Sequence, residues 1–212
     1  MSSTLKNAGL LTGGALIVSV VTQIVYMMTL GGADEPTHAG YTAYFAERGA
    51  EIGTVWMIEL AAFTLVTVAA LTALARQCAM PAAWAALALS GVFNAIQVAM
   101  GLSFFPAIIS AGEEFFPLFR VVVAGAFFFY FLAKVLIGLA AAGFGMSLLR
   151  SAGIAAKTVG GLALLSGVAA TIVNIIALPQ GTGLVFPAGA TGTAAAFIGG
   201  IAILMAVRQD TE

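Results

Sequence analysis

The chain has 212 residues, of which 61% are hydrophobic and only 8% charged, whereas a soluble domain carries about 25% charged residues. Its 8 basic and 9 acidic residues nearly cancel, which excludes nucleic-acid binding through a basic surface. The single cysteine, Cys78, excludes a disulfide scaffold, and the single histidine, His38, argues against a histidine-ligated haem or zinc site. The class that remains is an integral membrane protein.

Six apolar stretches are long enough to cross the hydrocarbon core of a bilayer, which takes about 20 helical residues. They cover residues 8–30, 53–75, 82–105, 119–149, 155–178 and 186–207. The first stretch is too long for the apolar core of a signal peptide, so we interpret it as a retained helix. Prolines fall at or near each predicted boundary: Pro36, Pro81, Pro106, Pro117, Pro179 and Pro187. We expect an all-α fold, with residues 1–212 forming one six-helix transmembrane domain surrounded by membrane lipids.

The distribution of lysine and arginine predicts the orientation, because cytoplasmic loops are enriched in these residues. With the N-terminus inside, the cytoplasmic segments hold five basic residues, Lys6, Arg76, Arg150, Lys157 and Arg208. The outer segments then hold two, Arg48 and Arg120. Both termini are therefore predicted to be cytoplasmic. In a bacterium the protein would be a multi-pass protein of the inner membrane, since outer-membrane proteins are closed barrels of short strands.

The largest segment between predicted spans covers residues 31–52. Its residues Tyr41, Tyr44, Phe45 and Arg48 follow one another at helical spacings of three and four, so they would share one face of a helix. We expect a short interfacial helix over the outer end of the bundle. It would either rest in the lipid headgroups or act as a lid over a cavity.

Polar side chains inside the spans are the candidate functional residues, because ionisable groups are costly in hydrocarbon. Glu59 lies in the second span and Lys134 in the fourth, and four amides accompany them: Gln23, Asn94, Gln97 and Asn174. Most of these residues lie roughly 16 or 17 positions from a basic residue at the inner end of their span, about 25 Å along a helix. Thr191 occupies that position in the last span, counted from Arg208. The spacing predicts a polar layer in the outer half of the bilayer.

Three interpretations of this layer remain open. Glu59 and Lys134 have opposite charges at similar depth and are expected to pair, because each alone in lipid costs several kcal/mol. The pair and the amides could hold the helices together, since lipid offers no hydrophobic drive for helix association. Alternatively, they could line a polar pocket for an anionic, zwitterionic or hydroxylated group, or form a path for protons or ions.

The fourth span also contains five consecutive aromatic residues, Phe127, Phe128, Phe129, Tyr130 and Phe131, which must wrap the whole helix. Those facing inward could pack ordinarily or line a slot for a flat apolar ligand. Enzyme chemistry has little support, because the spans hold no histidine and no paired carboxylates. We therefore expect no catalytic residue, no metal site and no cofactor.

Three segments resemble a domain-of-unknown-function family of six-helix bacterial inner-membrane proteins. They are the opening NAGLLTGGALI, the second span IGTVWMIELAAFTLVTVAALTALARQ, and LIGLAAAGFGMSLLRSAGIAAKTVGGLALLSG, which joins two glycine-rich helices. The turn in the last segment reads SAGIAAKT, where such proteins usually have a proline. The resemblance implies a six-span fold and no particular activity.

The leading functional hypothesis is an intramembrane polar pocket in the outer half of the bilayer that binds or passes a small or amphipathic ligand. Glu59 and Lys134 would hold the polar group, and Gln23, Asn94, Gln97 and Asn174 would line the pocket. One alternative is an accessory subunit of a larger respiratory or photosynthetic membrane complex, or a homo-oligomer. Another is a membrane enzyme acting on a lipid.

Overall fold

The computed structural model describes residues 3–76 and 78–209, and these residues form six long helices joined by short connections. The long helices are α1 (Ser3–Val25), α2 (His38–Ala75), α3 (Pro81–Ala111), α4 (Phe116–Leu149), α5 (Ile154–Ala177) and α6 (Val185–Gln209). Shorter helical turns are η1 (Tyr26–Leu30), η2 (Glu113–Phe115) and η3 (Leu178–Gln180). All six long helices are apolar and long enough to span a membrane, so the all-α, six-helix prediction is confirmed and the chain has the architecture of a multi-pass membrane protein.

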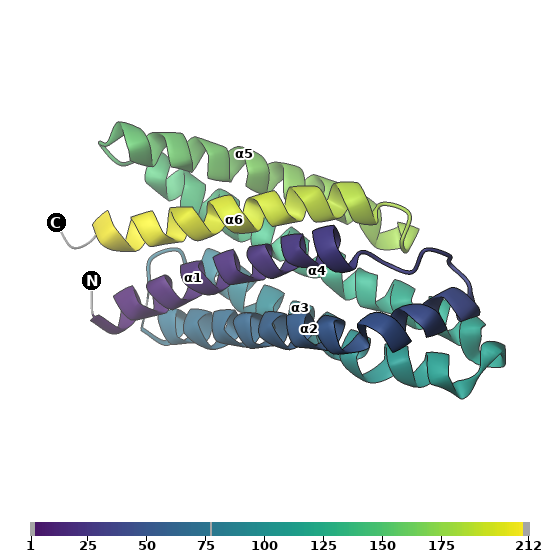
Figure 1. Cartoon of the computed structure of the whole chain (residues 1–212). Helices are drawn as coiled ribbons and strands as arrows, with labels where there is room; N and C mark the ends of the chain where they lie inside the picture. The colour runs from purple at the N-terminus through teal and green to yellow at the C-terminus, as the bar shows by residue number, and fades with distance from the viewer. Residues whose placement is uncertain (1–2, 77, 210–212) are drawn as a thin grey trace.

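Five of the helices form a ring in which each packs against the next, in the order α1, α2, α3, α4, α6 and back to α1. Helix α5 packs outside this ring against α4 and α6, and it lies at one edge of the bundle in Figure 1. Side chains that point from α1, α2, α4 and α6 toward the axis of the ring can therefore meet. Hydropathy alone does not reveal this arrangement.

The two ends of the bundle differ. Both described chain ends lie at the same end of the bundle (Figure 1), which we call the terminal end. Helices α2, α3 and α4 extend beyond the other helices at the opposite end, which we call the far end. If the prediction of cytoplasmic termini holds, the far end is the outer one.

The expected interfacial helix over residues 31–52 does not exist as a separate element, because α2 runs without a break from His38 to Ala75. The Thr37 side chain caps its first turn by accepting a hydrogen bond from the Gly40 backbone N–H at 3.1 Å. The aromatic face predicted for this segment packs sideways onto the extended part of α4, where the Tyr41 and Phe119 rings lie 4.7 Å apart. The segment 31–52 contains four acidic residues. Because it packs against α4, most of it nevertheless forms the first part of a long helix.

Pro106 also departs from the prediction, because it lies inside α3 rather than at its end. A proline in a helix loses a backbone hydrogen bond and usually breaks or kinks it. Here its neighbours Phe105 and Ile109 are buried with Phe119 in a far-end apolar cluster, which offsets that cost. The helix ends instead at Ala111. The next residue, Gly112, has a φ of 131°, which glycine adopts far more readily than residues with a side chain.

Helices α4 and α5 approach closely through two reciprocal pairs of glycines. A Cβ atom built on Gly138 would lie 2.6 Å from the Gly167 carbonyl oxygen, and one on Gly167 would lie 2.5 Å from the Gly138 oxygen. Gly145 and Gly160 repeat the arrangement, with corresponding distances of 2.6 and 2.8 Å. Small residues of this kind let helix backbones pack closely in lipid. They hold α5 against the ring.

Candidate functional site

The amide of Gln23 joins the two charged residues of the membrane spans. Its Nε2 donates a hydrogen bond to Glu59 Oε1 at 2.7 Å, and its Oε1 accepts one from Lys134 Nζ at 3.0 Å. This orientation of the amide is the only one that suits both partners, because a carboxylate only accepts and an ammonium only donates. We call Gln23, Glu59, Lys134 and their partner Thr193 the central polar cluster.

The cluster lies inside the helix ring, with one residue from each of α1, α2, α4 and α6. Lys134 is fully buried, Glu59 is 7% exposed, and Gln23 is half-buried. The expected pairing of Glu59 and Lys134 is indirect, since both ion pairs found among the described residues involve Arg48. The physical reason is that Gln23 is long enough to reach across the ring and lie between the two charges.

Helix α6 contributes Thr193, whose hydroxyl donates a second hydrogen bond to Gln23 Oε1 at 2.9 Å. Depth counting had pointed to Thr191, but that hydroxyl bonds to the backbone of its own helix, at Pro187 and Ala188. Two residues along a helix correspond to a rotation of about 200°, so the two threonines face different sides. Counting residues from Arg208 estimates the depth of a side chain but not the side of the helix on which it lies, so it could not distinguish Thr191 from Thr193.

Two further features position Lys134, and sequence reasoning did not identify them as part of the site. A Cβ atom on Gly192 would lie 2.6 Å from Lys134 Cδ, so the missing side chain makes room for the lysine stem. The Lys134 ammonium lies 4.9 Å from the centre of the Tyr130 ring, one helical turn away on α4. That separation allows a cation–π contact, which partly replaces the lost hydration of the ammonium. The sequence contained one indication of this contact: Tyr130 precedes Lys134 by four residues, about one helical turn.

The other three predicted lining residues are not hydrogen-bonded to the cluster. Asn94 is fully buried on α3 and its Nδ2 donates to the Ser90 carbonyl of its own helix at 3.0 Å. Asn174 is fully buried on α5, outside the ring, and donates to Ala170 and to Ala188 of α6. Gln97 is half-buried and makes no side-chain hydrogen bond within the described part of the chain.

Two of these amides leave an acceptor unused. The Oδ1 atoms of Asn94 and Asn174 are buried without a hydrogen-bond partner among the described residues. Phe93, next to Asn94, stacks on Phe129, next to Tyr130, with ring centres 6.0 Å apart. Asn94 therefore lies at the same level of the bundle as Tyr130. A buried carbonyl oxygen without a donor is costly, so a water or ligand donor at this level would be favourable.

The aromatic run of α4 surrounds the helix as expected. Phe131 is fully buried, Phe128 is exposed, and Phe127, Phe129 and Tyr130 are half-buried. Phe127, Tyr130 and Phe131 pack with one another and against residues of α5 and α6. These contacts are those of ordinary packing between helices.

Two half-open surface pockets are found, and neither is lined by the central polar cluster. One of about 280 Å³ lies between α1 and α2 at the terminal end, lined by residues that include Asn7 and Leu65. The other, of about 380 Å³, lies at the far end and is lined by the 30–48 segment, including Tyr44 and Arg48. We call the second one the far-end cavity. Among the described residues no group of three His, Cys, Asp or Glu side chains could hold a metal ion.

No protein-family model, no curated protein and no solved structure matches this chain.

Proposed function

We propose that the protein is an integral membrane protein whose central polar cluster binds the polar group of a small or amphipathic ligand. Glu59 and Lys134 hold that group from opposite sides, and Gln23 and Thr193 orient the two charged residues. Asn94 offers a further acceptor at the same level of the bundle.

The separation of the two charges carries this proposal. In a purely structural pair, the carboxylate and the ammonium would be in direct contact, because each then best offsets the desolvation of the other. Here Gln23 lies between them, and each charge keeps unused hydrogen-bonding capacity. An ammonium has three donors, and Lys134 gives one to Gln23; a carboxylate can accept about four hydrogen bonds, and Glu59 accepts one. A hydroxylated or zwitterionic group could satisfy both residues at once.

Binding requires side chains to move. Lys134 is fully buried, and the cluster lines neither of the two surface pockets. The half-buried members, Gln23 and Thr193, are the parts of the cluster that a ligand can reach first. The proposal therefore predicts a protein that opens to take up its ligand and closes over it.

Native mass spectrometry of the protein extracted in a mild detergent tests the proposal. We expect wild type to carry a bound non-protein mass. Glu59→Gln removes the carboxylate charge and should lower the liganded fraction by about tenfold or more, because hydrogen bonds to charged groups contribute about 1.5–3 kcal/mol. Glu113→Gln is the control, since it makes the same change on an exposed residue of η2 that lines neither pocket. It should leave the liganded fraction unchanged.

The proposal would be contradicted by an equal bound mass in Glu59→Gln and the control variant, or by the absence of any bound mass in wild type and both variants. The cluster would then have a structural role. The same spectra report stoichiometry. A complex with other chains would favour the accessory-subunit alternative, and a bound lipid altered between substrate and product would favour the enzyme.

A further inference from the structure

A pair of aromatic side chains lies directly on the far-end side of the central polar cluster. Tyr26 follows Gln23 by three residues, and Trp56 precedes Glu59 by three residues on the antiparallel helix α2. Both spacings are close to one helical turn, so each ring lies above a member of the cluster. The two rings are stacked, with centres 5.9 Å apart and planes 28° apart. We call Tyr26 and Trp56 the aromatic pair.

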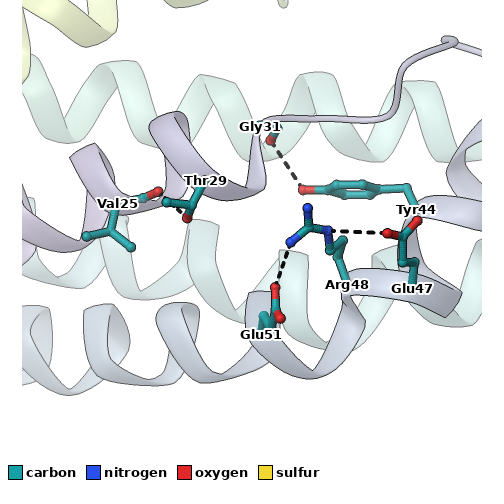
Figure 2. A network of polar contacts seen from close by, with 7 residues as sticks. All are labelled: Val25, Thr29, Gly31, Tyr44, Glu47, Arg48 and Glu51. Atoms are coloured by element: carbon teal, nitrogen blue, oxygen red, sulfur yellow. Dashed lines mark hydrogen bonds and ion pairs between the residues drawn. The ribbon is translucent and has the colours of Figure 1, made fainter.

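The aromatic pair is held from both sides. A Cβ atom on Gly101 of α3 would lie 2.8 Å from the Trp56 ring, so the indole lies flush against that helix. On the other side, Tyr44 donates its hydroxyl hydrogen to the Gly31 carbonyl at 3.2 Å (Figure 2). The Tyr26 and Tyr44 hydroxyls are 3.0 Å apart. Because Tyr44 has only one hydrogen to give, Tyr26 is the donor between them, and a chain runs from Tyr26 through Tyr44 to Gly31.

Tyr26 belongs to an irregular turn. Residues 26–30 form the π-helical turn η1, closed by a hydrogen bond of 2.8 Å from Gly31 N–H to the Tyr26 carbonyl. The Thr29 hydroxyl bonds to the Val25 carbonyl at 2.7 Å (Figure 2), which satisfies an acceptor near the irregularity. Such π turns are often found at functional sites, and they are less favourable than α-helical turns.

The far-end cavity adjoins the aromatic pair through Tyr44. Tyr44 lines this cavity and contacts Tyr26. The remaining lining is strongly polar, and Figure 2 shows Arg48 bonded to Glu47 and Glu51 beside the Tyr44 ring. A cavity with charged walls admits a hydrated molecule more readily than a lipid chain.

We infer that the ligand of the central polar cluster is a small water-soluble molecule that arrives through the far-end cavity, and that the aromatic pair is the gate it must pass. Tyr44 latches the gate through its hydrogen bond to Gly31, and opening requires that bond to break. Lateral arrival from the lipid is the competing route. This inference rests on the proposed function only in naming the cluster as the destination.

Thiol labelling of a cysteine placed inside the gate tests the inference without any ligand. Cys78→Ala removes the one native thiol, which is buried near the terminal end and whose burial raises its pKa. Thr193→Cys then places a thiol in the cluster, and a charged, membrane-impermeant methanethiosulfonate is the probe, with the protein in lipid nanodiscs. We expect slow labelling with the gate intact. Trp56→Ala should speed it by about tenfold or more, since it removes an aromatic contact and opens the route.

Tyr44→Phe is a milder second variant that removes only the latch hydroxyl and should also speed labelling. Trp84→Ala is the matched control, because Trp84 is a buried tryptophan at the terminal end that packs against Phe144. This control should not speed labelling. Faster labelling in Trp84→Ala would indicate a route from the terminal end or a general loosening of the bundle.

The inference would be overturned if the charged probe labelled Thr193→Cys equally fast with and without the gate substitutions. Labelling by a lipophilic maleimide alone, unaffected by Trp56→Ala, would establish lateral access instead. Both results are independent of the bound mass seen for wild type and Glu59→Gln. Failure of the gate and failure of the binding site are therefore distinguishable.

Discussion

Gln23 is the residue on which the central polar cluster depends most. Its amide makes three hydrogen bonds, to Glu59, Lys134 and Thr193, which lie on three other helices. A neutral amide between opposite charges satisfies both without letting them collapse into a contact pair. The cost of desolvating the two charges is thereby partly offset while their remaining hydrogen-bonding sites stay available.

Replacing Gln23 should therefore destabilise the protein. We expect Gln23→Leu to lower the free energy of unfolding by about 2–4 kcal/mol, because it leaves buried charged partners unsatisfied. Gln97→Leu is the control, since it makes the same substitution at a half-buried amide that has no side-chain hydrogen bond to any described residue, and it should change stability by about 0.5 kcal/mol or less. Unfolding in mixed detergent micelles measures both. Equal effects of the two substitutions would show that Gln23 has no special role.

At this scale the sequence pointed to three residues that the structure brings together in the central polar cluster. Glu59, Lys134 and Gln23 could be selected because polar groups are rare in spans and because they lie at similar distances from basic residues at the helix ends. Thr193 and Gly192 could not, because a threonine or glycine in a membrane helix is common and carries no signal until the rotation of α6 is known. The same two criteria select Asn174, yet it lies on the helix outside the ring.

At the scale of elements, glycine spacing decides how tightly helices approach. The Gly138–Gly167 and Gly145–Gly160 pairs are seven residues apart on each helix, which is close to two turns, so both lie on the same α4–α5 interface. Because each missing Cβ faces a backbone carbonyl rather than a flexible side chain, the neighbour cannot easily yield.

A methyl group at this interface should separate the helices. We expect Gly167→Ala to destabilise the protein by about 1–3 kcal/mol through overpacking. Gly161→Ala, on the same helix, has nothing within 4 Å of the new Cβ and should be neutral or stabilise by up to about 1 kcal/mol, since alanine favours helix. Melting temperatures of the two variants in the same detergent make the comparison. A more stable Gly167→Ala would refute close packing here.

Four helix boundaries at the terminal end were well predicted, since Ala75, Pro81, Leu149 and Ile154 lie within one residue of the expected limits, whereas α1 begins at Ser3 rather than at residue 8. At the far end, the end of α5 and the start of α6 also lie within one residue of the expected limits, whereas α2 begins at His38 rather than at residue 53 and α3 ends at Ala111 rather than at residue 105. The segment before residue 53 contains several charged residues, so its hydropathy resembles that of a loop. Its helical conformation depends on packing against the extended ends of α3 and α4, which hydropathy does not report.

At the scale of the whole molecule, the ring of five helices creates an interior where polar side chains from four helices converge. Which helices adjoin could not be read from the sequence, because all six are similarly apolar. The ring explains why a lysine and a glutamate far apart in the chain share one amide.

A crystal structure of the protein grown from a lipidic phase, after purification in mild detergent, would show whether Gln23 separates the two charges and whether a ligand contacts them. We predict that the Gln23 amide lies between Glu59 and Lys134 and that non-protein density contacts the unused sides of both charged groups. A direct ion pair between Glu59 and Lys134, closely packed and without such density, would contradict the account.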